Sequence, residues 1–171
     1  MLKLDLPPDL AQQVTAALMK AGHREIGGIL MGEHVGPNAF AIRDLTIHSR
    51  GTFATFIRNV GKALAGLARF RARTGNLHRQ FNYMGEWHSH PLFALYPSDP
   101  DRHTMREIVA SPQMKDAQFL VLVIVKLGPE DRLQASAFTY LPDGSEHASE
   151  IHISSRDRRA DGAVRSTHGY G

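Results

Sequence analysis

Hydrophobic residues recur at helical spacing in three stretches of the chain. Spacings of three and four residues predict a first helix over Pro7–Gly22, where Gly22 supplies a stop signal. The same pattern predicts a second helix over Asn59–Arg73, with arginines at its solvent positions, and a third over Pro100–Ala110. The expected apolar faces are Leu6, Leu10, Val14, Ala17, Leu18 and Ala21 for the first helix, and Val60, Ala63, Leu64, Leu67 and Ala68 for the second.

Runs of β-branched, aromatic and aliphatic residues, bounded by turn signals, predict strands around these helices. The almost wholly apolar run Phe119–Leu127 is typical of a strand that is buried on both faces. Pro142-Asp143-Gly144 predicts a turn, after which Glu150–Ser154 is expected to add an edge strand. The other predicted strands are Glu25–Glu33, Phe40–His48, Thr52–Ile57, Phe81–His90 and Leu133–Leu141.

This order of elements predicts one α+β domain over residues 1–154. We expect a mixed, largely antiparallel sheet flanked by about three helices. A length of 171 residues suits a single hydrophobic core. Residues 155–171 show no periodicity and little hydrophobicity, so we expect a flexible basic tail there.

The composition excludes several classes of protein. The chain has no cysteine, which rules out disulfides, thiolate zinc sites and a cysteine nucleophile. The net charge is only +3, so the charge gives little support for a nucleic-acid partner, and we expect none. No apolar run approaches the roughly 20 residues of a membrane span, and the first ten residues lack a signal-peptide core. We therefore expect a cytoplasmic protein with no membrane partner.

The strongest chemical signal is a pair of histidines followed by an aspartate. His88 and His90 are two residues apart, so on a strand both imidazoles point to one face, and Pro91 ends the strand. Asp101 lies in Ser98-Asp99-Pro100-Asp101, which reads as the first turn of a helix. Two imidazoles and one carboxylate leave a tetrahedral zinc with one open position, the ligand count of a catalytic site. We expect one Zn²⁺ per chain.

Hydrolysis at such a metal requires a base and a donor for the oxyanion. Glu25 is the candidate base, because it stands at a helix-to-strand junction just before Gly27 and Gly28, which allow the backbone to pass close to a site. Ser98 is the candidate oxyanion donor, since its turn also delivers Asp101. Ser98 equally fits a helix cap, and the two roles could coexist.

Three neighbouring side chains have plainer interpretations. Glu86 shares the strand face of His88, and we favour a paired strand carboxylate over a partner that supports a ligand. His103 follows Asp101 by two helical positions, so it should face away from the metal. Trp87 points to the opposite strand face, where we expect it in the core rather than against a substrate.

Taken together, these residues resemble the JAMM (JAB/MPN+) zinc metallopeptidases. That family has a glutamate before a Gly-Gly strand, then His-x-His-Pro, then Ser-x-x-Asp. Here Glu25-Ile26-Gly27-Gly28, His88-Ser89-His90-Pro91 and Ser98-Asp99-Pro100-Asp101 match the pattern with the right spacing. The resemblance extends over about residues 4–141. It implies an MPN/JAB-type fold, zinc ligands at His88, His90 and Asp101, an acid–base role for Glu25 and oxyanion stabilisation by Ser98.

The implied activity is cleavage of an isopeptide or peptide bond after the C-terminal glycine of a ubiquitin-like protein. The short stretch Ser111–Gln118 lacks the insertion that gives larger members their linkage specificity. The compact chain is most similar to the stand-alone bacterial JAB peptidases of CBASS and other antiviral defence operons. In those operons they reverse a ubiquitin-like conjugation beside E1- and E2-like proteins, which are the expected partners.

Two other functions fit the same motif. A JAMM peptidase of sulfur-carrier metabolism would trim an adduct from a protein that also ends in Gly-Gly. A non-catalytic MPN scaffold would keep the fold without hydrolysis, although every motif position is present here.

Overall fold

The computed structural model describes residues 1–48, 60–77 and 79–154. The strand expected over Thr52–Ile57 and the tail expected from residue 155 lie outside the described residues. The described helices are α1 (Pro8–Ala21), α3 (Val60–Arg73) and α4 (Asp99–Val109), with short 3₁₀ turns at Pro112–Met114 and Pro129–Asp131. Among the described residues, no helix is both long enough and apolar enough to cross a membrane.

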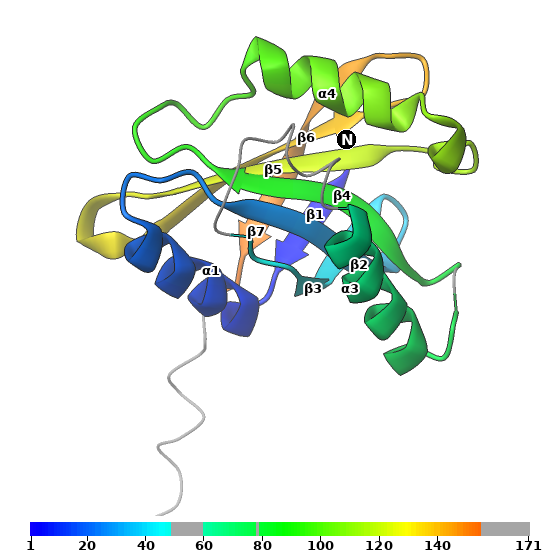
Figure 1. The fold of residues 1–171 in the computed structure, drawn as a ribbon, viewed down its shortest axis with the longest axis horizontal. Coiled ribbons are helices and arrows are strands. Elements are labelled where there is room, and N and C mark those ends of the chain that lie inside the picture. Colours follow the sequence, from blue (N-terminus) through cyan, green and yellow to red (C-terminus); the bar gives the residue numbers. More distant parts are fainter. Residues whose placement is uncertain (49–59, 78, 155–171) are drawn as a thin grey trace, which may run out of the picture.

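The strands form one mixed sheet (Figure 1). In spatial order they run β1, β3, β2, β4, β5, β6 and β7, and β7 pairs again with β1, so the sheet closes on itself. Three pairings are parallel, namely β1–β3, β1–β7 and β4–β5, and the other four are antiparallel. The strand bounds are β1 Lys3–Leu6, β2 Gly27–Gly36, β3 Ala39–Leu45, β4 Phe81–Ser89, β5 Leu120–Leu127, β6 Leu133–Tyr140 and β7 Glu146–Ile153. The predicted α+β class with a mixed sheet is confirmed.

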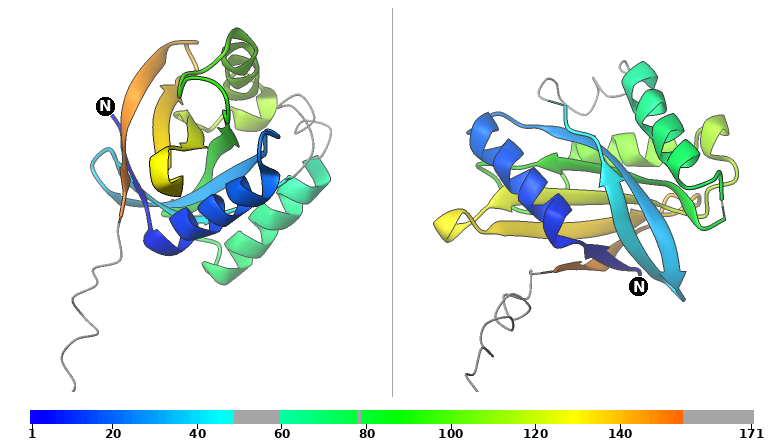
Figure 2. Two further views of the ribbon diagram at one scale, coloured as in Figure 1. Left: turned by 90° about the vertical axis from the view of Figure 1, so that its left-hand side faces the viewer. Right: turned by 90° about the horizontal axis from the view of Figure 1, so that it is seen from below.

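Strand β5 is buried on both faces, as its unbroken apolar sequence predicted. Val121, Val123 and Val125 pack with Leu10, Val14 and Leu18 of α1 in one core cluster. Leu120, Leu122 and Ile124 pack with Met105 and Val109 of α4 in a second. Helices α1 and α4 therefore lie on opposite sides of β4 and β5 (Figures 1 and 2).

The first and last strands differ from the expectation. Leu6, which we placed on the face of the first helix, belongs to β1 and is only 2% exposed. The last strand begins at Glu146 rather than Glu150, and it is no edge, because it pairs with both β6 and β1. The pairing with β1 joins segments that are far apart in sequence, and a local hydrophobic pattern carries no information about it.

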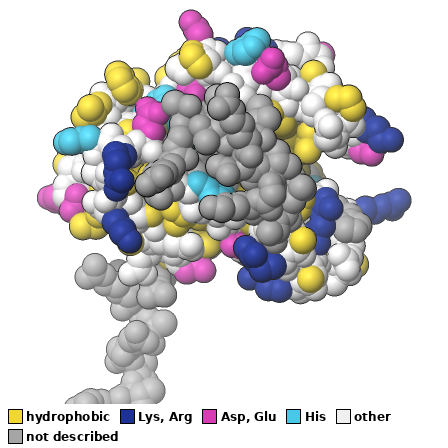
Figure 3. All heavy atoms as spheres, viewed as in Figure 1, with side chains coloured by type: hydrophobic (Ala, Val, Ile, Leu, Met, Phe, Trp, Pro, Cys, Tyr) yellow, Lys and Arg dark blue, Asp and Glu magenta, His cyan; other side chains and the backbone are white. Residues whose placement is uncertain are grey.

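The described part of α3 agrees in part with the predicted apolar face. Leu67 packs against the cluster of Ile29, Met31 and Phe70, as expected, and the side chains of residues 60–65 lie outside the described part of the chain. Ala68 is exposed, whereas Phe70 is buried against Ile29 and Met31 of β2. Gly66 lies one turn before Phe70 and contacts Thr46. The buried face of α3 therefore includes a glycine, which a search for apolar side chains does not find. The exposed Arg69 and Arg73 agree with the predicted solvent face, and Lys and Arg side chains gather over this helix (Figure 3).

Candidate metal centre

The two histidines lie at the end of β4, the strand between β2 and β5. His88 pairs with Gly27 on one side and with Ile124 on the other. His90 follows the last strand residue, and its N–H donates to the Val125 carbonyl at 2.9 Å. Trp87 points to the opposite face, where it is 2% exposed in the core. The predicted alternation is therefore confirmed.

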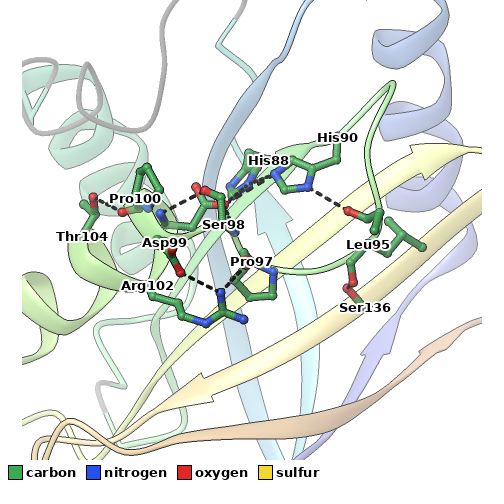
Figure 4. A network of polar contacts seen from close by, with 12 residues as sticks. His88, His90, Leu95, Pro97, Ser98, Asp99, Pro100, Arg102, Thr104 and Ser136 are labelled. Atoms are coloured by element: carbon green, nitrogen blue, oxygen red, sulfur yellow. Dashed lines mark hydrogen bonds and ion pairs between the residues drawn. The ribbon is translucent and has the colours of Figure 1, made fainter.

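Asp101 reaches the histidines from the first turn of α4. Figure 4 shows the two histidines facing the start of this helix at Ser98 and Asp99. Ser98 is the N-cap: its Oγ accepts from the Asp101 N–H at 3.3 Å, while Asp101 Oδ2 accepts from the Ser98 N–H at 2.7 Å. This reciprocal pair is a capping box. The Ser98 hydroxyl also donates to Asp101 Oδ2 at 2.7 Å. The cap role of Ser98 is thus observed, and its oxyanion role stays a prediction.

The three candidate ligand atoms converge on one point. His88 Nε2 lies 2.9 Å from His90 Nε2, and each of these nitrogens lies 3.5 Å from Asp101 Oδ2. Bonds of about 2.0–2.2 Å in a tetrahedral zinc site separate neighbouring ligand atoms by about 3.3 Å. The donor set and its spacing therefore fit a zinc ion, and these residues could hold one metal between them.

The electrostatics of the cluster favour a cation. Burial acts to raise the pKa of Asp101, but hydrogen bonds with His88, His90 and Ser98 hold that pKa well below its usual value. The hydrogen bond with Asp101 is the main cause of a raised pKa at His90, which burial partly opposes. An ionised carboxylate therefore faces two imidazoles in a nearly closed site, and a metal ion would supply the positive charge there.

The position of Glu25 near this centre is set by the hydrogen bonds of the residue that follows it, Ile26. The carboxylate is exposed, and its charge contributes to the raised pKa of His90. The following residue, Ile26, is tied to Ser89, which stands between the two histidines. The structure thus brings Glu25, His88, His90, Ser98 and Asp101 to one region; their chemical roles stay predictions.

The predicted close approach at the glycine pair is confirmed. A Cβ on Gly27 would lie 2.5 Å from the Trp87 carbonyl oxygen, and one on Gly28 would lie 1.8 Å from that of Thr46. No side chain fits at such distances. Gly27 therefore lets the strand that follows Glu25 lie directly against the histidine strand, and Gly28 lets it lie against Thr46 on its other side.

Comparisons with known proteins identify the family of this chain. A family model described as prokaryotic homologs of the JAB domain matches residues 7–138. This chain belongs to the prokaryotic JAB family. It is 35% identical over 121 residues to the CD-NTase/cGAS isopeptidase of Enterobacter hormaechei subsp. hoffmannii (strain UCI 50), in an alignment that covers 68% of this chain. That alignment spans 62% of the relative's length. The predicted family resemblance is confirmed.

A solved structure shows the same fold. The solution structure of protein DSY2949 from Desulfitobacterium hafniense superposes with a TM-score of 0.59. The match covers 90% of this JAB chain and 94% of that one, at 18% identity. It supports the architecture alone.

The loop Pro91–Pro97 of the JAB domain is fixed through its backbone carbonyls. His90 Nδ1 donates to the Ala94 carbonyl at 2.9 Å, which leaves Nε2 directed at the metal centre. Ser136 Oγ donates to the Leu95 carbonyl at 2.7 Å, and Lys126 Nζ to that of Phe93 at 3.4 Å (Figure 4 shows the first two donors). Sequence reasoning missed these anchors, because nothing local marks a serine or lysine as the partner of a distant carbonyl.

The plainer interpretations of the neighbouring residues agree with their contacts. Glu86 is 1% exposed and accepts a hydrogen bond from Tyr83 Oη at 3.2 Å. Burial raises the pKa of Glu86 well above its usual value, and the hydrogen bond with Tyr83 acts in the opposite direction. His103 is exposed and pairs with Glu107 one turn on, which confirms that it faces away from the centre.

Proposed function

We propose that this JAB protein is a zinc-dependent isopeptidase that releases a target protein from the C-terminal glycine of a modifier. The convergence of His88 Nε2, His90 Nε2 and Asp101 Oδ2 carries this proposal. Membership of the JAB family and the isopeptidase named as a relative support it.

In this proposal His88, His90 and Asp101 hold the metal. A bound zinc ion would supply a Lewis acid that acidifies water and polarises a carbonyl. Glu25 accepts a proton from the attacking water and returns it to the departing amine. The Ser98 hydroxyl, released from Asp101, donates to the oxyanion. With a metal bound, the substrate carbonyl would be polarised where Ser98 can donate to its oxygen, and the leaving nitrogen would lie within reach of Glu25.

Burial of the centre favours a slender substrate tail. His88, His90 and Asp101 are 9%, 6% and 7% exposed, so only a narrow chain segment reaches them. In this proposal, side chains just before the cut bond would collide with Glu25, and glycine avoids this. Since glycines bury little apolar area, the folded body of the modifier must supply most of the affinity.

The modifier belongs to one of two chemical classes. The relative is named an isopeptidase of CD-NTase/cGAS, which favours a conjugate of such a nucleotidyltransferase. A ubiquitin-like protein is the class implied by the JAMM motif. In this proposal the enzyme acts in the cytoplasm beside E1- and E2-like proteins and reverses their conjugation during antiviral defence.

Cleavage of defined conjugates tests the proposal. Two substrates are made, a CD-NTase-type protein and a ubiquitin-like protein, each joined through its C-terminal glycine to a lysine side chain. We expect the zinc-loaded protein to release the amine from at least one, and a chelator to stop it. Replacing the last glycine by valine should slow cleavage far more than changing the released protein.

Three outcomes would contradict this proposal. Equal cleavage of unstructured peptides without a glycine tail would indicate a general peptidase. Cleavage of only a small-molecule adduct from a protein that ends in Gly-Gly would favour a peptidase of sulfur-carrier metabolism. Bound zinc with no hydrolysis of any substrate would favour a scaffold.

A further inference from the structure

The side chain of Arg102 spans three segments around the metal centre. Its Nη1 donates to the Pro97 carbonyl at 2.6 Å, and its Nε donates to Glu146 Oε2 at 3.1 Å. Its guanidinium carbon lies 5.0 Å from the centre of the Tyr96 ring. One planar cation thus contacts the end of the loop, the start of α4 and strand β7 (Figure 4 shows its bonds to Pro97 and Asp99).

These contacts surround the residues that deliver the ligand. Pro97 directly precedes Ser98, whose N–H and hydroxyl both donate to Asp101 Oδ2. Arg102 directly follows Asp101 in the chain. The Pro97 carbonyl and the Asp101 backbone are therefore fixed to each other by one side chain, across the turn that carries the carboxylate.

Glu146 holds the guanidinium in its orientation. Its side chain is 15% exposed, and that of Arg102 is 21% exposed, so the pair is shielded from much of the solvent. On the other side Tyr96 packs edge-to-face on Phe138, with ring centres 5.1 Å apart. The arginine is thus confined between an acidic group on β7 and an aromatic ring anchored on β6.

We infer that Arg102 is a positioning residue that sets the affinity of this centre for its metal. It holds Pro97 and Ser98 so that Asp101 Oδ2 faces the two histidines, and Glu146 keeps it there. Partners that orient metal ligands commonly contribute 10–100-fold to metal affinity. The inference rests on the proposed metal site, and it assigns to Arg102 no contact with substrate.

Arg106 provides a matched control on the same helix. Its Nη2 lies 3.8 Å from the same Glu146 carboxylate, and its Nε donates to the Gly144 carbonyl at 3.2 Å. Both arginines therefore connect α4 to the β6–β7 hairpin, whereas the hydrogen bond to the Pro97 carbonyl is made by Arg102. Arg106→Gln also removes a positive charge that faces Glu146, but it leaves the contacts of the Ser98 turn unchanged.

The test measures zinc dissociation constants by competition with a chromophoric chelator, together with melting temperatures. We expect Arg102→Gln to weaken zinc binding by about 10–100-fold, and Arg106→Gln to leave it within about twofold. Arg102→Lys keeps a positive charge beside Glu146 but lacks the planar guanidinium that can donate to Glu146 and to the Pro97 carbonyl at once. Its melting temperature should therefore be higher than that of Arg102→Gln, while its zinc binding stays weak. Glu146→Gln, which leaves Arg102 less firmly held, should weaken zinc binding less than Arg102→Gln.

The outcomes separate this inference from the proposed function. A wild-type protein that binds no zinc would overturn both. A wild type that binds zinc, with Arg102→Gln and Arg102→Lys binding it as tightly as Arg106→Gln, would overturn the positioning role alone. Equal losses of melting temperature in Arg102→Gln and Arg106→Gln with unchanged zinc binding would show that both arginines serve only to hold α4.

Discussion

Ile26 and Ser89 exchange two hydrogen bonds beneath the candidate metal centre. The Ile26 N–H donates to Ser89 Oγ at 3.0 Å, and the Ser89 N–H donates to the Ile26 carbonyl at 2.8 Å. Ser89 is completely buried and stands between the two histidines, while Ile26 directly follows Glu25. The middle residue of the His-x-His motif thus connects the candidate base to the candidate ligands.

Ser89→Ala should therefore damage both stability and turnover. The substitution leaves the Ile26 N–H without its acceptor in a buried position, a loss of about 1–3 kcal/mol in the free energy of unfolding. Turnover should fall while zinc content stays at the wild-type level, because the ligands themselves are unchanged. Ser149→Ala, which removes a hydroxyl paired with Thr139 between β6 and β7, is the control and should leave turnover unchanged. Full activity in Ser89→Ala would show that Glu25 needs no such anchor.

Metal analysis should find about one zinc per chain, from the three-ligand count of an open site. His88→Ala and Asp101→Ala should each lose most of the metal. His103→Ala is the matched control, because this exposed histidine lies two residues after Asp101 and pairs with Glu107 instead. Equal zinc in all four proteins would mean that the metal binds elsewhere.

The fold class and the local backbone features at the candidate site were predictable from the sequence, whereas the roles of the site residues stay predictions. The spacing of His88, His90 and Pro91 defines a strand end, and Ser98 with Asp101 defines a capped helix start; both follow local rules. Gly27 and Gly28 likewise mark a close approach by their lack of a side chain. Each of these features is determined by a few consecutive residues.

What could not be predicted joins residues that are far apart in the sequence. Strand β1 is only four residues long, and its Leu4 pairs with Phe40 and Ile151. The polar sequence of β7 does not indicate that this strand lies between β6 and β1. Arg102 and Glu146 are likewise 44 residues apart. Such contacts depend on how the sheet closes, which local patterns do not encode.

Asp5→Asn should change the acid stability of the junction between β1 and β7. Burial acts to raise the Asp5 pKa, but hydrogen bonds from Ser154 and His152 outweigh it and lower the pKa below the usual 3.8. A lowered pKa in the folded state stabilises the protein above pH 3.8, and this contribution is lost as pH falls through the folded-state value. The side chain is 42% exposed, so we expect at most about 1 kcal/mol at neutral pH.

Urea unfolding, followed by the fluorescence of the single buried Trp87, measures this effect. The difference between wild type and Asp5→Asn should be present at pH 7 and disappear as the pH falls through the folded-state pKa of Asp5, which lies below 3.8. Asp116→Asn, at an exposed position outside the strands, should show no such pH dependence. A difference that persists unchanged at low pH would mean that the Asp5 charge contributes nothing.

Glu25→Gln should keep the metal and lose the activity. The carboxylate is exposed beside the centre and is proposed to move protons, whereas the ligand atoms come from His88, His90 and Asp101. An amide of the same shape cannot accept a proton near neutral pH, so turnover should fall at least about 10²-fold. Zinc content and melting temperature should match the wild type. Glu107→Gln, an exposed glutamate on α4, serves as the control and should cleave normally. If Glu25→Gln turns over at the wild-type rate, another group takes the proton; if it loses zinc, Glu25 belongs to the ligand set.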